Sequence, residues 1–187
     1  MVKPLLMIAM AGYSCWLLSD LLEVFSGQYG APVAYLTAAF HLLVGVGFTG
    51  LFRSVTTARG WLLWVMTGLV SISHLALAAL ILHVYWSGDG VRVVLGTYPV
   101  YLLFLLGWAV GILVFSLLVI RSGRVPVLAG WAMLFGFVLL ILSRSMAWPA
   151  LWIHFITVAL SALLIYLCRL GLRRIFAQEF TTRPDPR

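Results

Sequence analysis

Six long apolar stretches, separated by short polar segments, dominate the pattern of residues along the chain. Each has about 20 residues, the length that an α-helix needs to cross a bilayer. Apolar and polar residues do not alternate within them, as they would in membrane β-strands. The pattern predicts an all-α integral membrane protein, with residues 1–175 forming a single domain, a bundle of six transmembrane helices. The helices are expected at residues 4–25, 32–52, 61–84, 98–120, 127–147 and 149–170.

The composition supports this assignment, because 64% of the 187 residues are hydrophobic and only 9% are charged. A soluble domain carries roughly 25% charged residues and needs them to cover its surface. The six stretches use most of the chain, which leaves residues 176–187 as a short polar tail. We therefore expect the lipid bilayer to be the solvent of this protein.

The basic residues predict the orientation of the bundle. Ten of the twelve flank the same ends of the six stretches, and this bias marks the cytoplasmic side of membrane proteins. These ten are Lys3, Arg53, Arg59, Arg121, Arg124, Arg169, Arg173, Arg174, Arg183 and Arg187. Both termini are then cytoplasmic, and we expect a prokaryotic plasma (inner) membrane. The net charge of +7 has a topological explanation, and we expect no nucleic-acid partner.

Two glycine patterns lie within predicted helices. Residues 45–50 match the G-x-G-x-x-G dinucleotide pattern, but that motif needs a preceding strand, which a membrane helix does not supply. Small residues in membrane helices more often allow close helix packing. We expect the Gly45/Gly47/Gly50 face and the Gly107/Gly111 face to pack inside the bundle, against other membrane subunits or in a homo-oligomer.

The ionisable residues inside the helices all fall in the outer half of the membrane. A rise of about 1.5 Å per residue places His41 and His74 roughly 14–15 Å below the outer helix ends, and His154 about 8 Å below. Asp20, Glu23 and Arg144 also lie in the outer third. Such residues are costly in hydrocarbon, so they are candidates for function.

His41 and His74 have nearly the same depth on consecutive antiparallel helices, which usually are neighbours. Two facing imidazoles could bind a haem b iron from both sides. Together with His154, Asp20 or Glu23, they could instead hold a transition metal. One hypothesis is therefore a redox membrane protein or subunit that could exchange electrons with quinol, with His41 and His74 as ligands and with His154 and Arg144 beside the cofactor.

Two alternatives remain open. In size, helix count and orientation the chain resembles the substrate-binding subunits of energy-coupling-factor vitamin transporters, which implies an outward-facing site for a small molecule. Asp20, Glu23, Trp16, Tyr35 and Trp152 would then line that site. The other alternative is a scaffold or assembly subunit whose histidines only hydrogen-bond neighbouring helices. No motif names catalytic residues, so the sequence leaves enzymatic activity undecided.

Overall fold

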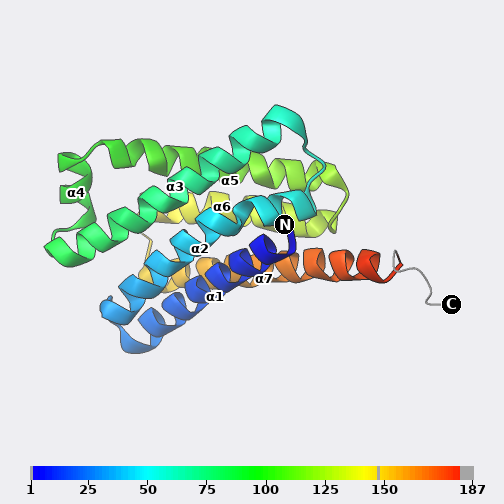
Figure 1. Ribbon diagram of the computed structural model, residues 1–187. Coiled ribbons are helices and arrows are strands. Elements are labelled where there is room, and N and C mark those ends of the chain that lie inside the picture. Colours follow the sequence, from blue (N-terminus) through cyan, green and yellow to red (C-terminus); the bar gives the residue numbers. More distant parts are fainter. Residues whose placement is uncertain (1, 147, 182–187) are drawn as a thin grey trace.

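The computed structural model describes residues 2–146 and 148–181. Within these ranges the chain forms seven helices and no strand (Figure 1). Six of the helices are long and apolar enough to cross a membrane, which indicates a membrane-embedded protein. The helices are α1 (Val2–Ser26), α2 (Ala31–Val55), α3 (Gly60–Ser87), α4 (Val91–Thr97), α5 (Val100–Ser122), α6 (Val127–Ser145) and α7 (Ala150–Thr181).

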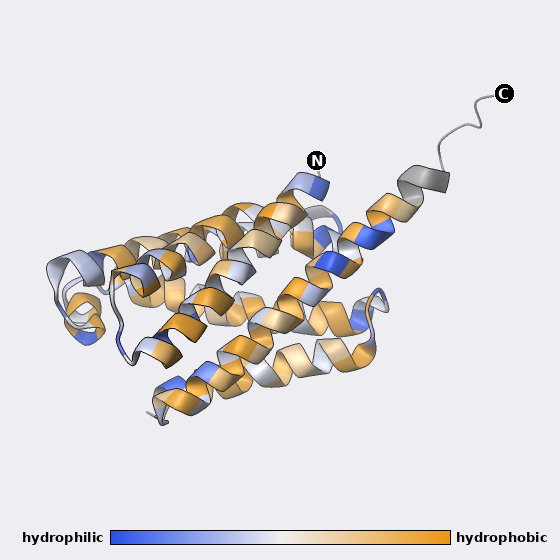
Figure 2. Ribbon diagram, turned by 90° about the horizontal axis from the view of Figure 1, so that it is seen from below, coloured by the Kyte–Doolittle hydropathy of each residue, from blue (hydrophilic) through white to orange (hydrophobic). Residues whose placement is uncertain are grey.

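The six long helices form a closed ring in which each packs against its neighbours in the chain. Helix α1 contacts α2, α2 contacts α3, and α3 contacts α5. Helix α5 contacts α6, α6 contacts α7, and α7 contacts α1, which closes the ring. Short loops favour this antiparallel order. The first and last helices therefore lie side by side, as Figures 1 and 2 show, although they are farthest apart in sequence.

Two elements differ from the sequence prediction. Residues 91–97, expected in a loop, form the short helix α4, whose buried Val94 packs on Leu77 and Leu80 of α3. Helix α7 continues to Thr181 instead of ending near residue 170. Leu172 and Ile175 pack against the main core, so this extension has an apolar face to bury. The predicted tail therefore begins as helix, and residues 182–187 lie outside the described part of the chain.

Both glycine faces are covered by helices of the same chain. A Cβ added at Gly47 would lie 2.6 Å from the Leu5 carbonyl oxygen, so only glycine allows α1 to approach this closely. On α5, a Cβ at Gly111 would lie 2.5 Å from a methyl group of Val70. Packing within the bundle, one of the arrangements expected for these faces, is therefore the arrangement observed in this chain.

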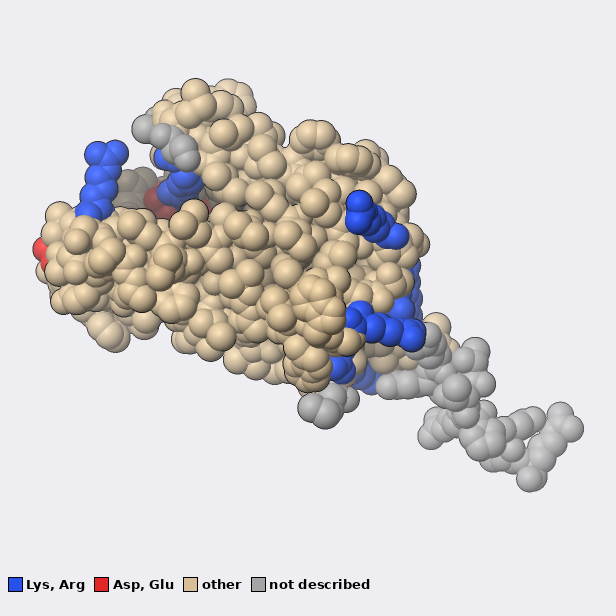
Figure 3. Space-filling view, turned by 90° about the horizontal axis from the view of Figure 1, so that it is seen from above, with Lys and Arg blue, Asp and Glu red and all other residues tan. Residues whose placement is uncertain are grey.

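Charges separate between the two ends of the bundle. The basic end, where the chain begins, carries most lysines and arginines, as Figure 3 shows. At the opposite end, which we call the acidic end, acidic atoms lie partly recessed beside basic side chains. Its residues lie at or near the α1–α2, α3–α5 and α6–α7 connections: Asp20, Glu23, Asp89, Arg92 and Arg144. Hydrophobic residues cover the helices between the two ends (Figure 2).

Candidate functional site

The contact between α1 and α7 brings three ionisable side chains together near the acidic end. Asp20 and Glu23 are three residues apart on α1, so they project from the same helix face. His154 lies in the second turn of α7, which packs against α1. We call Asp20, Glu23 and His154 the carboxylate–histidine cluster.

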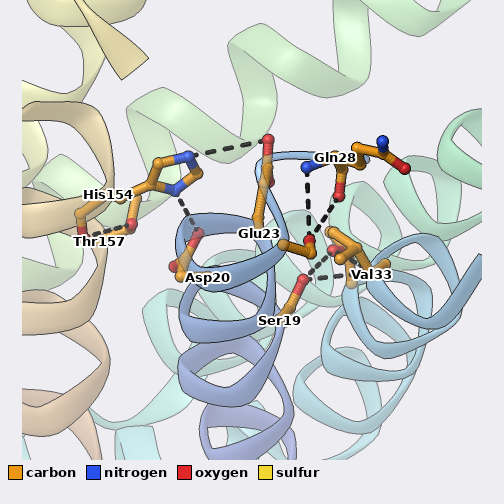
Figure 4. Close-up of polar contacts among 9 residues, drawn as sticks. Ser19, Asp20, Glu23, Gln28, Val33, His154 and Thr157 are labelled. Carbon is orange, nitrogen blue, oxygen red and sulfur yellow. Dashed lines mark hydrogen bonds and ion pairs between the residues drawn. The ribbon is translucent and has the colours of Figure 1, made fainter. Parts of the chain in front are cut away.

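Each nitrogen of His154 faces one of the two carboxylates (Figure 4). Nδ1 lies 3.2 Å from Asp20 Oδ1, and Nε2 lies 3.7 Å from Glu23 Oε1. The imidazole is therefore oriented from both sides. Asp20 and His154 are buried, whereas 30% of the Glu23 side chain is exposed, so the cluster reaches from the interior toward the surface.

The second carboxylate oxygen of Asp20 has no hydrogen-bond partner, although it is buried. The Thr157 hydroxyl lies beside this carboxylate, but it donates to the carbonyl oxygen of His154 at 3.0 Å. A buried oxygen of this kind is costly unless a donor, a water or a cation satisfies it. Asp20 Oδ2 is therefore an unsatisfied acceptor that a proton, a water or a cation could satisfy.

The donor types of the cluster suit a metal ion, and its ligand atoms lie near one another, somewhat more widely than around a bound ion. One ligand atom from each of the three residues can be chosen so that all lie within 4.8 Å of one another. Two ligands that each lie about 2.1 Å from a zinc ion are roughly 3–4 Å apart, depending on the angle between them. Two carboxylates also supply the negative charge that a divalent cation would neutralise, and three protein ligands leave coordination positions open.

Hydroxyl groups join α1 to α2 directly beside the cluster. The hydroxyl oxygens of Ser19 and Thr37 lie 2.6 Å apart, and each also lies within hydrogen-bond distance of the Val33 carbonyl oxygen. The two hydroxyl hydrogens make two of these three contacts at a time. Figure 4 shows Ser19 and Val33 next to Asp20 and Glu23. These bonds fix the part of α1 near the acidic end, and thus the direction in which its two carboxylates point.

Tyr29, in the loop between α1 and α2, lies within electrostatic range of the cluster. Burial raises the pKa of its phenol, and the Glu23 carboxylate raises it further. A hydrogen bond with Thr37 and the Arg144 guanidinium act in the opposite direction, but the pKa still ends above its usual value. Tyr29 is therefore a neutral hydroxyl at neutral pH.

His41 and His74 face each other deeper in the bundle, between α2 and α3. Their Nδ1 atoms are 2.8 Å apart, so one ring donates a hydrogen bond to the other. Phe40 packs against both rings, and Trp108 approaches His74 edge-on with the ring centroids 6.5 Å apart. Both His74 Nε2 and the Trp108 indole nitrogen are buried without a partner.

The facing Nδ1 atoms of the two rings leave no room for a haem iron between them. Two axial nitrogens must lie about 4 Å apart, since each iron–nitrogen bond is about 2 Å long. The facing nitrogens are 2.8 Å apart and bonded to each other, so one ring would have to turn away before both could ligate one metal. The hydrogen bond between the two rings instead joins α2 to α3.

The other candidate residues do not gather at one site. Arg144 is exposed in the last turn of α6. Trp16 is buried and stacks on Phe40 at 4.6 Å, whereas Tyr35 and Trp152 are 50% and 60% exposed. Tyr35 contacts Tyr85 and Trp86, and Trp152 lies beside Phe155. The aromatic lining expected for a small-molecule pocket is therefore dispersed.

The sequence indicated the members of the carboxylate–histidine cluster but not their grouping. The spacing of Asp20 and Glu23 predicts a shared helix face, yet His154 lies 134 residues beyond Asp20. Only the closure of the ring by α7 brings it to them. The one sequence signal for this grouping was that all three residues lie near the same ends of their predicted helices. Arg144 shares that position, so the signal did not single out the cluster.

Comparison of the chain with protein-family models, with curated proteins and with solved structures finds no match in any of the three. The functional argument therefore rests on the geometry of the site.

Proposed function

We propose that the protein is a membrane-embedded metal-binding protein whose site is the carboxylate–histidine cluster. The observation that carries this proposal is the convergence of Asp20, Glu23 and His154, with ligand atoms within 4.8 Å of one another. The free Asp20 oxygen supports it, because a cation would satisfy that buried atom. Nitrogen and oxygen ligands together suit divalent manganese, iron or zinc.

The proposal includes an orientation. The basic end faces the cytoplasm, both termini lie inside, and the metal site opens toward the outer face of a prokaryotic plasma membrane. The charge separation between the two ends supports this placement, because basic residues concentrate on the cytoplasmic side of membrane proteins. The site is then loaded from outside through Glu23, its most exposed member.

We favour a redox role for the bound metal, in a membrane protein or subunit that exchanges electrons with a partner such as quinol. The mixed donor set with open positions supports this use, since it accepts redox-active iron or manganese. Transport of the cation is the second candidate, and the exposure of Glu23 favours it because it gives the ion a path to the surface. A resident metal exchanges slowly with added metal, whereas a transported one exchanges rapidly.

Metal binding by the purified protein in detergent tests this function. Titration with Mn²⁺, Co²⁺ and Zn²⁺, followed by calorimetry and by the visible spectrum of Co²⁺, should give one site per chain. Asp20→Asn and His154→Gln should each lower the affinity by about tenfold or more, as expected for the loss of a ligand or of its orienting partner.

His83→Gln and Asp89→Asn are the matched controls, because they change the same residue types outside the cluster. They should leave the affinity unchanged. A protein that binds no metal, or whose affinity responds equally to the cluster variants and to the controls, would refute the proposal.

A further inference from the structure

A pocket of about 250 Å³ lies at the basic end of the bundle, away from the carboxylate–histidine cluster. The loop between α2 and α3 forms most of its wall, and Arg53 and Arg124 complete it from the ends of α2 and of the α5–α6 loop. A water occupies roughly 30 Å³ in the liquid. The pocket therefore has room for a phosphate group with part of a headgroup or several waters.

Three arginines converge on this pocket: Arg53, Arg59 and Arg124. Hydrogen bonds join the end of α2 to the region of the α5–α6 loop, where Arg124 Nη1 donates to the Arg53 carbonyl oxygen at 2.9 Å. Ser122 also donates to the Val55 carbonyl oxygen at 2.8 Å. No carboxylate lines the pocket, so the described residues around it present three positive charges and no counter-charge.

The start of α3 adds further donors to the pocket. Gly60 and Leu63, in the first turn of α3, belong to the lining, and Arg59 at the N-cap makes no side-chain capping bond. The first backbone N–H groups of a helix lack partners within the helix and favour an anion. Thr56 and Thr57 contribute hydroxyl groups to the same wall.

The surroundings of the pocket are those of a membrane interface. Trp61 and Trp64 are 74% and 65% exposed beside it, and the Arg53 guanidinium lies 5.7 Å from the centre of a Trp64 ring. Exposed tryptophans at helix ends mark the level of the lipid headgroups. A basic pocket between membrane helices at this level is suited to an acidic lipid headgroup.

We propose that this pocket binds a phosphate group through Arg53, Arg59 and Arg124. The phosphate of an anionic phospholipid is the source that the interfacial position favours, and a soluble phosphate compound has the same binding chemistry. The arginines bind the oxygens as charged hydrogen-bond donors, and the start of α3 contributes its backbone dipole. This site is independent of the metal site at the acidic end.

Native mass spectrometry of the full-length protein with phosphatidylglycerol or phosphatidylcholine tests this inference. The protein should retain phosphatidylglycerol in preference, and Arg53→Gln, Arg59→Gln and Arg124→Gln should each lower that retention about fivefold. Arg59→Gln is the variant least able to disturb the fold, because Arg59 makes no capping bond. Arg124→Lys keeps the charge and should restore part of the binding.

Arg121→Gln and Arg174→Gln are the controls, since both remove an exposed arginine that lies outside the pocket. Inorganic phosphate is tested separately, by the thermal stabilisation of delipidated protein. If inorganic phosphate stabilises the protein only when the pocket arginines are present, and phosphatidylglycerol is not preferred, the pocket binds the phosphate of a soluble compound instead of a lipid. If neither probe depends more on the three pocket arginines than on Arg121 and Arg174, the inference is wrong.

Discussion

At the scale of single residues, the buried polar groups divide into two sets with different chemistry. The carboxylate–histidine cluster is short of a cation or proton, because Asp20 retains a free oxygen. In the His41–His74 pair one hydrogen bond joins the two rings, while His74 Nε2 is buried without a partner. The Trp108 ring, in T-shaped contact with His74, also has an unpaired indole N–H. The first set is thus suited to binding, and the second to joining α2 and α3.

Replacing the histidines singly and together tests this structural role. His41→Leu leaves His74 buried without its partner, so we expect a loss of about 1–3 kcal/mol in the free energy of unfolding. The double replacement His41→Leu with His74→Leu should cost less than the sum of the two single changes, because no unpaired imidazole remains. Unfolding in mixed detergent micelles provides the measurement. Strictly additive losses would show that the hydrogen bond contributes no stability.

At the scale of helices, glycines determine which helix backbones can come into direct contact, because they have no side chain to separate them. Gly47 and Gly50 allow the backbone of α1 to lie directly against α2, where a Cβ at Gly50 would be 2.6 Å from the Leu6 amide nitrogen. Packing of this kind replaces the hydrophobic effect, which gives no advantage between helices in lipid. The same approach aligns the outer part of α1, which carries Asp20 and Glu23.

Gly47→Ala should therefore destabilise the protein by about 1–3 kcal/mol, as overpacking of a tight contact does. Gly68→Ala is the matched control, because this glycine also lies within a long helix but has open space where a Cβ would be. The apparent melting temperature in detergent distinguishes them. Equal melting temperatures would mean that α1 and α2 can separate without cost.

The extension of α7 shows that contacts with the rest of the bundle can also determine how long a helix is. Beyond residue 170 the sequence is rich in arginine, yet the helix continues. Leu172 and Ile175 pack on the core, and the Lys3 ammonium lies 3.9 Å from the centre of the Phe176 ring. The core thus buries the apolar side chains of this extension, and α1 contributes the Lys3 ammonium that lies over Phe176.

At the scale of the whole molecule, the charged residues distinguish the two ends of the apolar bundle. Eight basic residues of the described chain flank the basic end, as expected for a cytoplasmic face: Lys3, Arg53, Arg59, Arg121, Arg124, Arg169, Arg173 and Arg174. The proposed metal site and the proposed phosphate site thus lie at opposite ends of the bundle.

Cysteine labelling in intact cells tests this topology. In a variant lacking Cys15 and Cys168, a cysteine at position 59 or 124 should react only after the membrane is made permeable. A cysteine at position 89 should react with an impermeant reagent from outside, because Asp89 lies at the acidic end. Labelling of position 59 from outside would show that the orientation is the opposite one, with the proposed metal site in the cytoplasmic half.

Length and hydropathy alone determined the helical class, the six long helices and their approximate bounds. In lipid a chain can satisfy its backbone locally only as helix, so this information lies within each segment. Residues 91–97 and the end of α7 escaped prediction because contacts with other helices stabilise them. The places of His41, His74 and His154 along their helices also followed from the sequence, because the helix bounds fix them.

Only the tertiary structure decided which of these residues meet. The rotation of each helix and the closure of α7 on α1 bring His154 to Asp20 and Glu23. The same packing turns His41 and His74 into direct contact, with no space for a metal between their facing nitrogens. Helix rotation depends on side-chain packing between segments far apart in sequence, and a nearly uniform apolar pattern leaves it unspecified.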